Sequence, residues 1–283
     1  MTEKKTDENA SCQQVPHNDD ALRSTLSQIT HTIMILSGKG GVGKSAVAVS
    51  LATLLAARGH AVGLLDIDFH GPSVPTMLGV HEKRLQATDA VLYPIEMGTL
   101  KIVSLGLILD QRSDAVIWRG PMKAGVIRQL LENVAWGALD YLIMDFPPGT
   151  GDEALSACQL VTDADGGIIV TTPQEVSLSD CRRCISFCRK LALPVIGVVE
   201  NMNGFVCPHC GTTSNIFSTG GGKAMAEQEA VPYLGSIPLD PAFMHACDDG
   251  RVFADGDVHE SVQRLFSDMV DVFYKQNNNK KGA

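Results

Sequence analysis

The chain has 283 residues, of which 45% are hydrophobic, and 23 Lys and Arg against 32 Asp and Glu give a formal net charge of -9. An acidic chain repels a phosphate backbone, so we do not expect a nucleic-acid partner. Eight cysteines in a chain of this length do not indicate a disulfide framework. The polar residues 1–30 carry no secretory signal, and the longest nearly apolar run, 46–57, is too short to cross a bilayer. We therefore expect a cytoplasmic protein in a reducing compartment, without a membrane partner.

Short β-rich runs alternate with helical segments along most of the chain. Nearly continuous apolar runs are typical of parallel strands that are covered on both faces. Six such runs are predicted strands: 32–37, 61–66, 100–105, 141–145, 167–172 and 195–200. The pattern predicts an α/β fold, a doubly wound and mostly parallel sheet flanked by helices, in a single domain over residues 29–276. Segments 1–28 and 277–283 are polar and are expected to be disordered.

The stretch SGKGGVGKS follows the first predicted strand and opens a helical run. It matches the phosphate-binding pattern G-x-x-x-x-G-K-[ST] in the required strand–loop–helix context. Glycines let backbone N–H groups surround an anion, Lys44 is expected to reach the β- and γ-phosphates, and the Ser45 hydroxyl is expected to ligate Mg²⁺. A glycine-rich turn without a ligand is the alternative. The predicted nucleotide-binding residues are Gly38, Lys39, Gly40, Gly41, Val42, Gly43, Lys44, Ser45 and Ala46.

Three carboxylates follow predicted strands and could complete a Mg²⁺–phosphate site. Asp66 and Asp68 come after the second predicted strand, and Asp145 ends the fourth, before a Gly/Pro-rich loop that could sense the γ-phosphate. We expect Asp145 to hold Mg²⁺ through water and Asp68 to orient or deprotonate the attacking water. The alternative for each residue is that it caps the helix or turn that follows.

Cys207 and Cys210 are two residues apart, with Pro208 and His209 between them. This spacing indicates a metal site, but a thiolate site normally has four ligands, and both zinc and an iron–sulfur cluster fit the pattern. We expect the His209 side chain to be exposed in the turn rather than to ligate the metal. Cys12 and Cys247 have no visible partner.

A second CxxC, at Cys181 and Cys184, is a rival source of ligands. Ser177 and Asp180 resemble a capping box at the start of a helix that ends before Pro194. Helical periodicity places the cysteines on one apolar stripe, so core packing is the preferred interpretation. The stripe comprises Cys181, Cys184, Ile185, Cys188 and Leu191, and Cys158 is expected in the core as well.

The extra lysine, Lys39, makes the phosphate loop resemble the deviant Walker A motif of the MinD/ParA-like ATPases. Further motifs, read together, resemble the Mrp/ApbC family of iron–sulfur cluster carrier ATPases. They are GPSVPTMLG (71–79), WRGPM (118–122), DYLIMDFPPGTGDE (140–153), TTPQEVSLSD (171–180), ENMNGFVCPHCG (200–211) and IPLDP (237–241). The resemblance runs from about residue 30 to 275.

The resemblance implies roles for individual residues. Lys39 would cross a homodimer interface to the partner's nucleotide and act in catalysis with Lys44 and Asp68. Asn201 would recognise adenine, and Pro238 and Asp240 would lie near the base. Cys207 and Cys210 would bind a 4Fe–4S cluster shared by two subunits. Some relatives carry a four-cysteine N-terminal site, which is not expected here because that region has only Cys12.

Both Lys39 and the two-cysteine half-site therefore call for a second copy of the chain, because a twofold axis repeats any surface site. The leading hypothesis is a homodimeric ATP-dependent carrier that hydrolyses ATP slowly and delivers a 4Fe–4S cluster to apo-proteins. The alternative is a MinD/ParA-like positioning ATPase with a structural zinc knuckle. The apolar stripe from Val258 to Phe273 has acidic neighbours and is expected to pack on the domain rather than on a membrane. A metal insertase of the related GTPases is disfavoured because we find no Asn-Lys-x-Asp guanine motif.

Overall fold

The computed structural model describes residues 19–69, 71–88, 90–108, 120–207, 209–210, 212–252 and 262–271. Its centre is an eight-stranded sheet in which every neighbouring pair is parallel except the pair at one edge. The strand order is β12 (Tyr233–Ser236), β9 (Val195–Glu200), β8 (Gly166–Thr171), β1 (Ile29–Ser37), β7 (Leu139–Asp145), β2 (Val62–Asp66), β6 (Leu100–Ser104) and β5 (Ile95–Met97).

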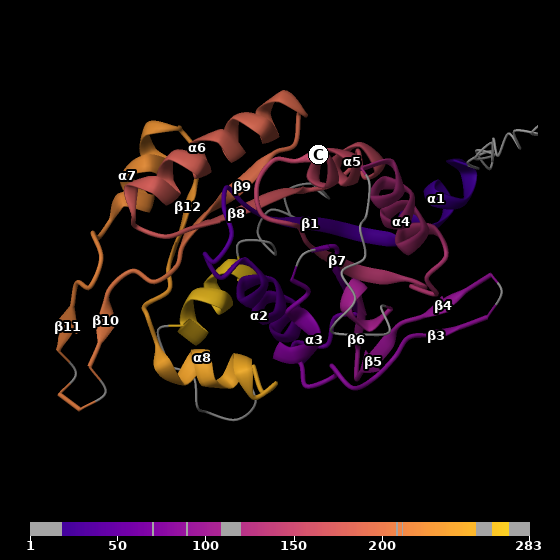
Figure 1. Ribbon diagram of the computed structural model, residues 1–283, viewed down its shortest axis with the longest axis horizontal. Helices are drawn as coiled ribbons and strands as arrows, with labels where there is room; N and C mark the ends of the chain where they lie inside the picture. Colours follow the sequence, from indigo (N-terminus) through magenta and orange to yellow (C-terminus); the bar gives the residue numbers. More distant parts are fainter. Residues whose placement is uncertain are drawn as a thin grey trace, which may run out of the picture.

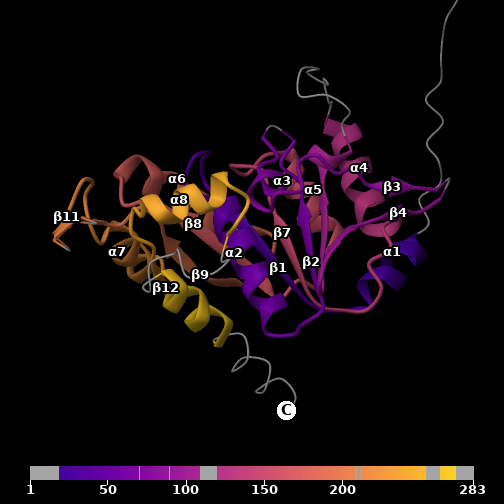
Figure 2. The ribbon, with the colours of Figure 1, turned by 90° about the horizontal axis from the view of Figure 1, so that it is seen from below.

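Helices cover both faces of this sheet (Figures 1 and 2). One face is covered by α2 (Lys44–Ala57), α3 (Val74–Met77), α8 (Pro241–Asp248) and a helix over residues 262–271. The other face is covered by α1 (Asp19–Leu26), α4 (Gly120–Glu132), α5 (Asp152–Leu160), α6 (Glu175–Lys190) and α7 (Gly221–Gln228). The predicted doubly wound, mostly parallel fold is confirmed.

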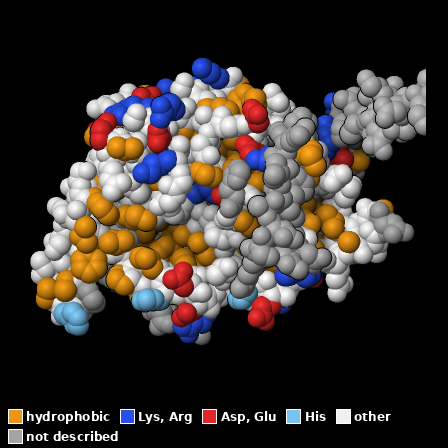
Figure 3. Space-filling model, in the orientation of Figure 1, with side chains coloured by type: hydrophobic (Ala, Val, Ile, Leu, Met, Phe, Trp, Pro, Cys, Tyr) orange, Lys and Arg blue, Asp and Glu red, His pale blue; other side chains and the backbone are white. Residues whose placement is uncertain are grey.

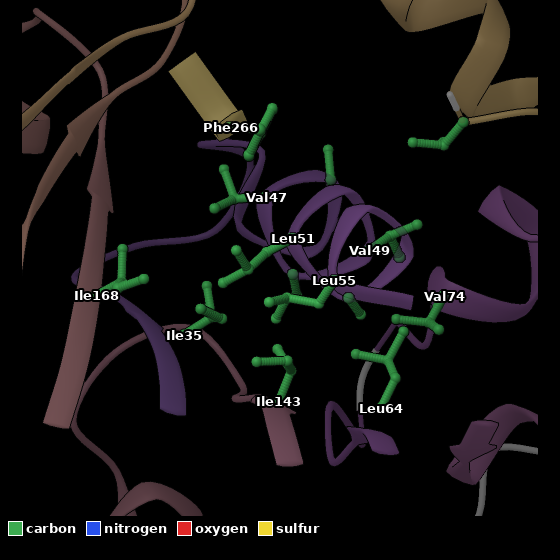
Figure 4. Packing of buried hydrophobic residues seen from close by; sticks show 14 of the residues in the cluster. Ile35, Val47, Val49, Leu51, Leu55, Leu64, Val74, Ile143, Ile168 and Phe266 are labelled. Carbon is green, nitrogen blue, oxygen red and sulfur yellow. The ribbon is translucent and has the colours of Figure 1, made fainter. Parts of the chain in front are cut away.

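The helix α2 is apolar on all sides because it is enclosed by other elements. Val47, Leu51 and Leu55 on α2 are fully buried, together with Ile35 from the sheet and Phe266 from the 262–271 helix (Figure 4). A helix that is hydrophobic all round is expected in such a position. Burial of this kind holds the N-terminus of α2, and with it the phosphate loop, in a fixed place.

The six predicted strands are all present, and the sequence missed two strands of the main sheet. The missed strands, β5 and β12, are short and lie at its two edges. Two small hairpins were missed as well: β3 (Gln86–Ala87) with β4 (Leu92–Tyr93), and β10 (Phe205–Val206) with β11 (Thr213–Ser214). Strands of this length have too few residues for a hydrophobic period to show.

The cysteine-bearing helix α6 is in the core, as its periodicity predicts. Cys181, Cys184 and Cys188 are fully buried, and Cys158 on α5 is buried beside them. The capping box predicted at Ser177 was wrong, because α6 already begins at Glu175. The Ser177 hydroxyl instead contacts the end of β8, where it bonds the Thr171 hydroxyl and accepts from the Thr172 backbone N–H.

The chain termini also differ in part from expectation. Residues 19–26 form the helix α1, with Leu22 buried, inside the segment 1–28 that we expected to be disordered. Residues 1–18 and 277–283 lie outside the described residues, as do Cys12, Val258 and Phe273. The 262–271 helix packs on the domain as predicted, burying Val262, Leu265, Phe266 and Met269. None of the described helices has the length and apolar content of a bilayer span.

Candidate functional site

The phosphate loop joins β1 to α2 at the carboxyl ends of the parallel strands, the usual ligand-binding edge of an open α/β sheet. Gly41 and Gly43 adopt φ angles of 77° and 84°, a left-handed region that glycine enters without a steric penalty. The loop borders a cavity of about 240 Å³. Its lining consists of Ser37, Lys39, Gly40, Gly41, Val42, Gly43, Lys44, Ser45, Ala46, Asp68, Gly71, Ser73, Met77 and Pro148.

Gly38 is the one predicted loop residue that does not line the cavity. A Cβ at this position would lie 2.3 Å from the backbone carbonyl carbon and oxygen of Asp180, so only glycine allows the loop to approach α6 this closely. The Gly/Pro-rich loop after β7 also reaches the phosphate loop, because the Gly149 N–H donates to the Ser37 carbonyl over 2.8 Å. The cavity is thus bordered by loops that follow β1, β2 and β7.

Lys44 and Asp145 form a buried ion pair at the floor of this site. The Lys44 ammonium lies 2.6 Å from Asp145 Oδ1 and 3.4 Å from the Ser45 hydroxyl. Burial raises the pKa of Asp145, and the Lys44 ammonium opposes that rise. Asp145 Oδ2 is buried and accepts no hydrogen bond from the described residues. An unpaired buried carboxylate oxygen beside a Ser hydroxyl fits Mg²⁺ held directly by Ser45 and through water by Asp145.

Asp66 lies opposite Asp145 on the neighbouring strand, β2. Its carboxyl group accepts hydrogen bonds from the Asp68 backbone N–H at 3.0 Å and from the Ser104 hydroxyl at 2.8 Å. The turn-capping alternative for Asp66 is therefore correct. Complete burial, with the nearby Asp145 carboxylate, raises the pKa of Asp66 to about 8. Asp68 lines the cavity, and its role in orienting the attacking water stays a prediction.

Of the residues predicted to lie near adenine, Asn201 contacts the phosphate loop. Asn201 is buried, and its amide donates to the Val42 carbonyl over 2.9 Å. A Cβ on Gly43 would lie 2.1 Å from the Asn201 amide nitrogen, so the contact depends on glycine there. Pro238 is partly buried, and Asp240 caps α8 by accepting from the Ala242 N–H at 2.9 Å. Adenine recognition by Asn201 and the proximity of Pro238 and Asp240 to the base stay predictions.

The two cysteines of the metal half-site lie in the turn between β10 and β11, at the tip of a hairpin that extends away from the sheet (Figures 1 and 2). Cys207 is partly buried, whereas Cys210 and His209 are exposed, as predicted for His209. The Cys207 N–H donates to the Thr212 carbonyl at 3.1 Å, and the Cys210 thiol lies 3.3 Å from the Thr212 hydroxyl. The Thr212 hydroxyl lowers the pKa of Cys210 and so favours the metal-binding thiolate.

The described residues contain no group of three or more His, Cys, Asp or Glu side chains that could hold a metal ion. The rival CxxC on α6 does not contribute, because Cys181 and Cys184 are fully buried in the core. Burial raises the pKa of Cys181 to about 12, which disfavours a thiolate. Within the described part of one chain, the hairpin therefore offers a two-cysteine half-site, with Cys210 exposed and Cys207 partly buried.

The short segment that follows β9 contacts the phosphate loop at its start and leads into the cysteine hairpin at its end. Asn201 contacts the phosphate loop, and Cys207 follows six positions later. The connection runs beside the segment before α8, where the Asn203 N–H donates to the Ile237 carbonyl at 3.0 Å and the Leu239 N–H donates to the Gly204 carbonyl at 2.8 Å. The residues predicted to meet nucleotide and metal are thus close along one continuous segment.

Comparison with known proteins identifies the family that this site belongs to. The ParA family, described as NUBPL iron-transfer P-loop NTPase, matches residues 28–273. The chain belongs to this family. The cytosolic Fe-S cluster assembly factor CFD1 of Eremothecium gossypii is 49% identical over 228 residues, covering 78% of this chain and 81% of that protein. The iron-sulfur cluster carrier protein of Methanocaldococcus jannaschii is 46% identical over 256 residues, covering 89% of this chain and 88% of that protein.

Solved structures agree with this assignment. A nucleotide-binding protein of Archaeoglobus fulgidus, in complex with ADP, has a TM-score of 0.74 and 36% identity, covering 85% of this chain and 95% of that one. The cell division ATPase MinD of Pyrococcus furiosus shares the fold, with a TM-score of 0.60 and 22% identity, covering 87% of this chain and 99% of that one. The predicted resemblance to iron–sulfur carriers of MinD/ParA-like fold is confirmed.

Sequence reasoning missed several residues of this region. Ser73 and Met77 line the cavity, and Ser104 supports Asp66, but none of the three stands in a phosphate-binding pattern. Lys123 on α4 pairs with Glu153 on α5, close behind the Gly/Pro-rich loop. The Lys123 ammonium also lies 5.4 Å from the centre of the Phe69 ring. Such contacts involve residues that are distant in the chain, so no local sequence pattern predicts them.

Proposed function

We propose that this protein is an ATP-dependent carrier that binds a 4Fe–4S cluster and transfers it to apo-proteins in the cytoplasm. The observation that carries the proposal is the pair Cys207, partly buried, and Cys210, exposed, on the segment that begins at the phosphate-loop contact of Asn201. Relatives of 49% and 46% identity are named a cytosolic Fe-S cluster assembly factor and an iron-sulfur cluster carrier protein, which supports the same function.

The cluster site is completed by a second copy of the chain. Two thiolates from each hairpin supply the four ligands that a 4Fe–4S cluster takes. Hydrophobic side chains gather on the surface over the hairpin and α8 (Figure 3). Ile216, just after β11, and Met244 on α8 are 55% and 53% exposed. An apolar surface next to an incomplete metal site supports a homodimer interface there. Lys39, which lines the cavity, would reach the partner's nucleotide.

The phosphate loop and its neighbours carry out slow ATP hydrolysis that serves switching. Gly40, Gly41 and Gly43 direct backbone N–H groups at the phosphates, and Lys44 leaves Asp145 to contact the β- and γ-phosphates. Ser45 and, through water, Asp145 would hold Mg²⁺, which would supply positive charge against the phosphates. Asp68 orients the attacking water.

Nucleotide and cluster are coupled because both sites form at the same dimer interface. If ATP changes how the two subunits face each other, it changes the distance between the two hairpins. Linkage then requires ATP and cluster to alter each other's affinity by the same factor. Equal ATP affinities with and without bound cluster would exclude this coupling.

Metal and sulfide analysis of anaerobically purified protein tests the function directly. We expect four iron and four sulfide per two chains, lost in Cys207→Ala. Cys158→Ala is the matched control, because it removes a buried thiol on α5, in the core on the opposite face of the sheet from α8. Stoichiometric zinc without sulfide would instead favour a MinD/ParA-like regulatory ATPase with a structural zinc knuckle, the second candidate that the fold and the CxxC turn support.

A further inference from the structure

Glu200 is a buried carboxylate that neither the phosphate site nor the cysteine turn uses. It is the last residue of β9, is 0% exposed, and accepts three hydrogen bonds. The Gly222 backbone N–H donates to Oε1 at 2.6 Å, whereas the Asn203 amide and the Tyr233 hydroxyl donate to Oε2 at 3.0 and 3.1 Å. These donors belong to α7, to the base of the cysteine hairpin and to β12. One side chain therefore ties the hairpin base to two elements of the domain.

The close packing around Glu200 depends on particular neighbours. A Cβ on Gly222 would lie 2.9 Å from the Glu200 Cβ and Cδ atoms, so glycine is what allows the first turn of α7 to reach the carboxylate. The N-terminal turn of a helix also favours negative charge. The Tyr233 hydroxyl is protonated at neutral pH, and burial raises its pKa further, to about 12, so it is a hydrogen-bond donor to the carboxylate.

The chain at the hairpin base adopts a conformation that needs support. Met202 has a φ of 59° and Gly204 a φ of 79°, so left-handed residues flank Asn203 on both sides. A side chain makes this conformation unfavourable, and it persists only where surrounding contacts fix it. The Asn201 side chain accepts from the Met202 N–H at 2.9 Å, on the phosphate-loop side of the turn. The Asn203 side chain is held by Glu200, on the hairpin side.

We propose that Glu200 is a positioning residue for the metal half-site. By holding Asn203, it fixes the direction in which the hairpin leaves the sheet and carries Cys207 and Cys210 toward the second subunit. Asn201 and Glu200 are adjacent, yet their side chains bond different parts of the molecule, the phosphate loop and the hairpin base. The metal-binding consequence rests on the proposed cluster-carrier function, whereas the effect on the hairpin does not.

Three substitutions around the same carboxylate separate positioning from general stability. Glu200→Ala removes the acceptor, Asn203→Ala removes the hairpin-side donor, and Tyr233→Phe removes the β12 donor. Hydrogen exchange of the amides in residues 205–214 is measured on the full chain without metal. We expect exchange to rise about tenfold or more in the first two variants, since a hydrogen bond to a charged group is lost, and to stay unchanged in Tyr233→Phe.

A conservative variant and a double variant complete the test. Glu200→Gln should restore most of the protection, because its oxygen accepts from Gly222 and its amide donates to a flipped Asn203. In the double variant Glu200→Ala, Asn203→Ala, the hairpin amides should exchange no faster than in either single variant, because the two side chains are partners in one interaction. Wild-type exchange in Asn203→Ala, with only a general loss of stability in Glu200→Ala, would overturn the positioning role.

The consequence for metal has its own readout. In cluster-loaded protein, a chelator should remove iron several-fold faster from Asn203→Ala than from wild type or Tyr233→Phe, while ATP affinity stays within about twofold. Equal iron-removal rates, despite altered hairpin exchange, would show that the hairpin's direction does not govern the site. A wild-type protein that holds no cluster would refute the proposed function and leave the exchange experiment valid.

Discussion

Alanine substitutions at Gly43 and Gly41 form a matched pair that tests the contact between the phosphate loop and Asn201. Both glycines are left-handed, with φ angles of 84° and 77°. A Cβ at Gly43 would lie 2.1 Å from the Asn201 amide nitrogen, whereas a Cβ at Gly41 would meet nothing within 4 Å. Gly41→Ala therefore introduces only the conformational penalty, about 1–2 kcal/mol. Gly43→Ala adds displacement of Asn201 and loss of its buried hydrogen bond, about 1–3 kcal/mol more.

Urea unfolding followed by circular dichroism, without nucleotide, measures both free energies of unfolding. We expect Gly43→Ala to be less stable than Gly41→Ala by about 1–3 kcal/mol. Asn201→Ala in the Gly43→Ala background should then cost almost nothing further, because the contact is already broken. Equal losses in the two glycine variants would refute the argument that Asn201 supports the loop.

Three further predictions concern buried charges and thiols. The pKa of Asp66 is raised from 3.8 to about 8, so its contribution to the stability of wild type should fall as the pH rises from about 4 to about 8, by at most about 1.4 kcal/mol per pH unit. In urea unfolding at pH 5 and pH 8, Asp66→Asn should therefore lose less stability with rising pH than wild type, and parallel pH profiles would contradict this. Iodoacetamide should alkylate Cys210 well before Cys181 in native metal-free protein, because the pKa of Cys210 is lowered and that of buried Cys181 is raised to about 12; equal rates by peptide mass spectrometry would oppose this. Lys123→Met should destabilise the protein by about 3 kcal/mol by removing the cation that faces the Glu153 carboxylate. Adding Glu153→Gln should recover part of the loss in a double-mutant cycle, whereas additive losses would rule out the pairing.

The sequence predicts the parts of this molecule that local patterns encode. Buried parallel strands appear as apolar runs, and the phosphate loop appears as a glycine pattern between a strand and a helix. The stripe of Cys181, Cys184 and Cys188 on α6 separates core thiols from the hairpin pair, and the structure confirms that division.

The remainder depends on contacts between distant residues. Asn201 meets Val42 across 159 positions, and Lys44 meets Asp145 across 101 positions. Ser177 has the local sequence of a cap, yet its hydroxyl is used by the end of β8 in the folded chain. Tertiary contacts override local preference at such sites, which is why Glu200 and Lys123 gave no signal in the sequence.

A mixed dimer tests most directly whether the metal site is shared by two chains. Wild-type chain and chain carrying Cys207→Ala and Cys210→Ala are co-expressed with different affinity tags, and mixed dimers that carry both tags are isolated anaerobically for iron and sulfide analysis. A shared site predicts about four iron and four sulfide in wild-type dimers and almost none in mixed dimers, because two thiolates cannot retain the cluster. Mixed dimers that keep half of the wild-type iron would place a complete site within each chain and contradict the account.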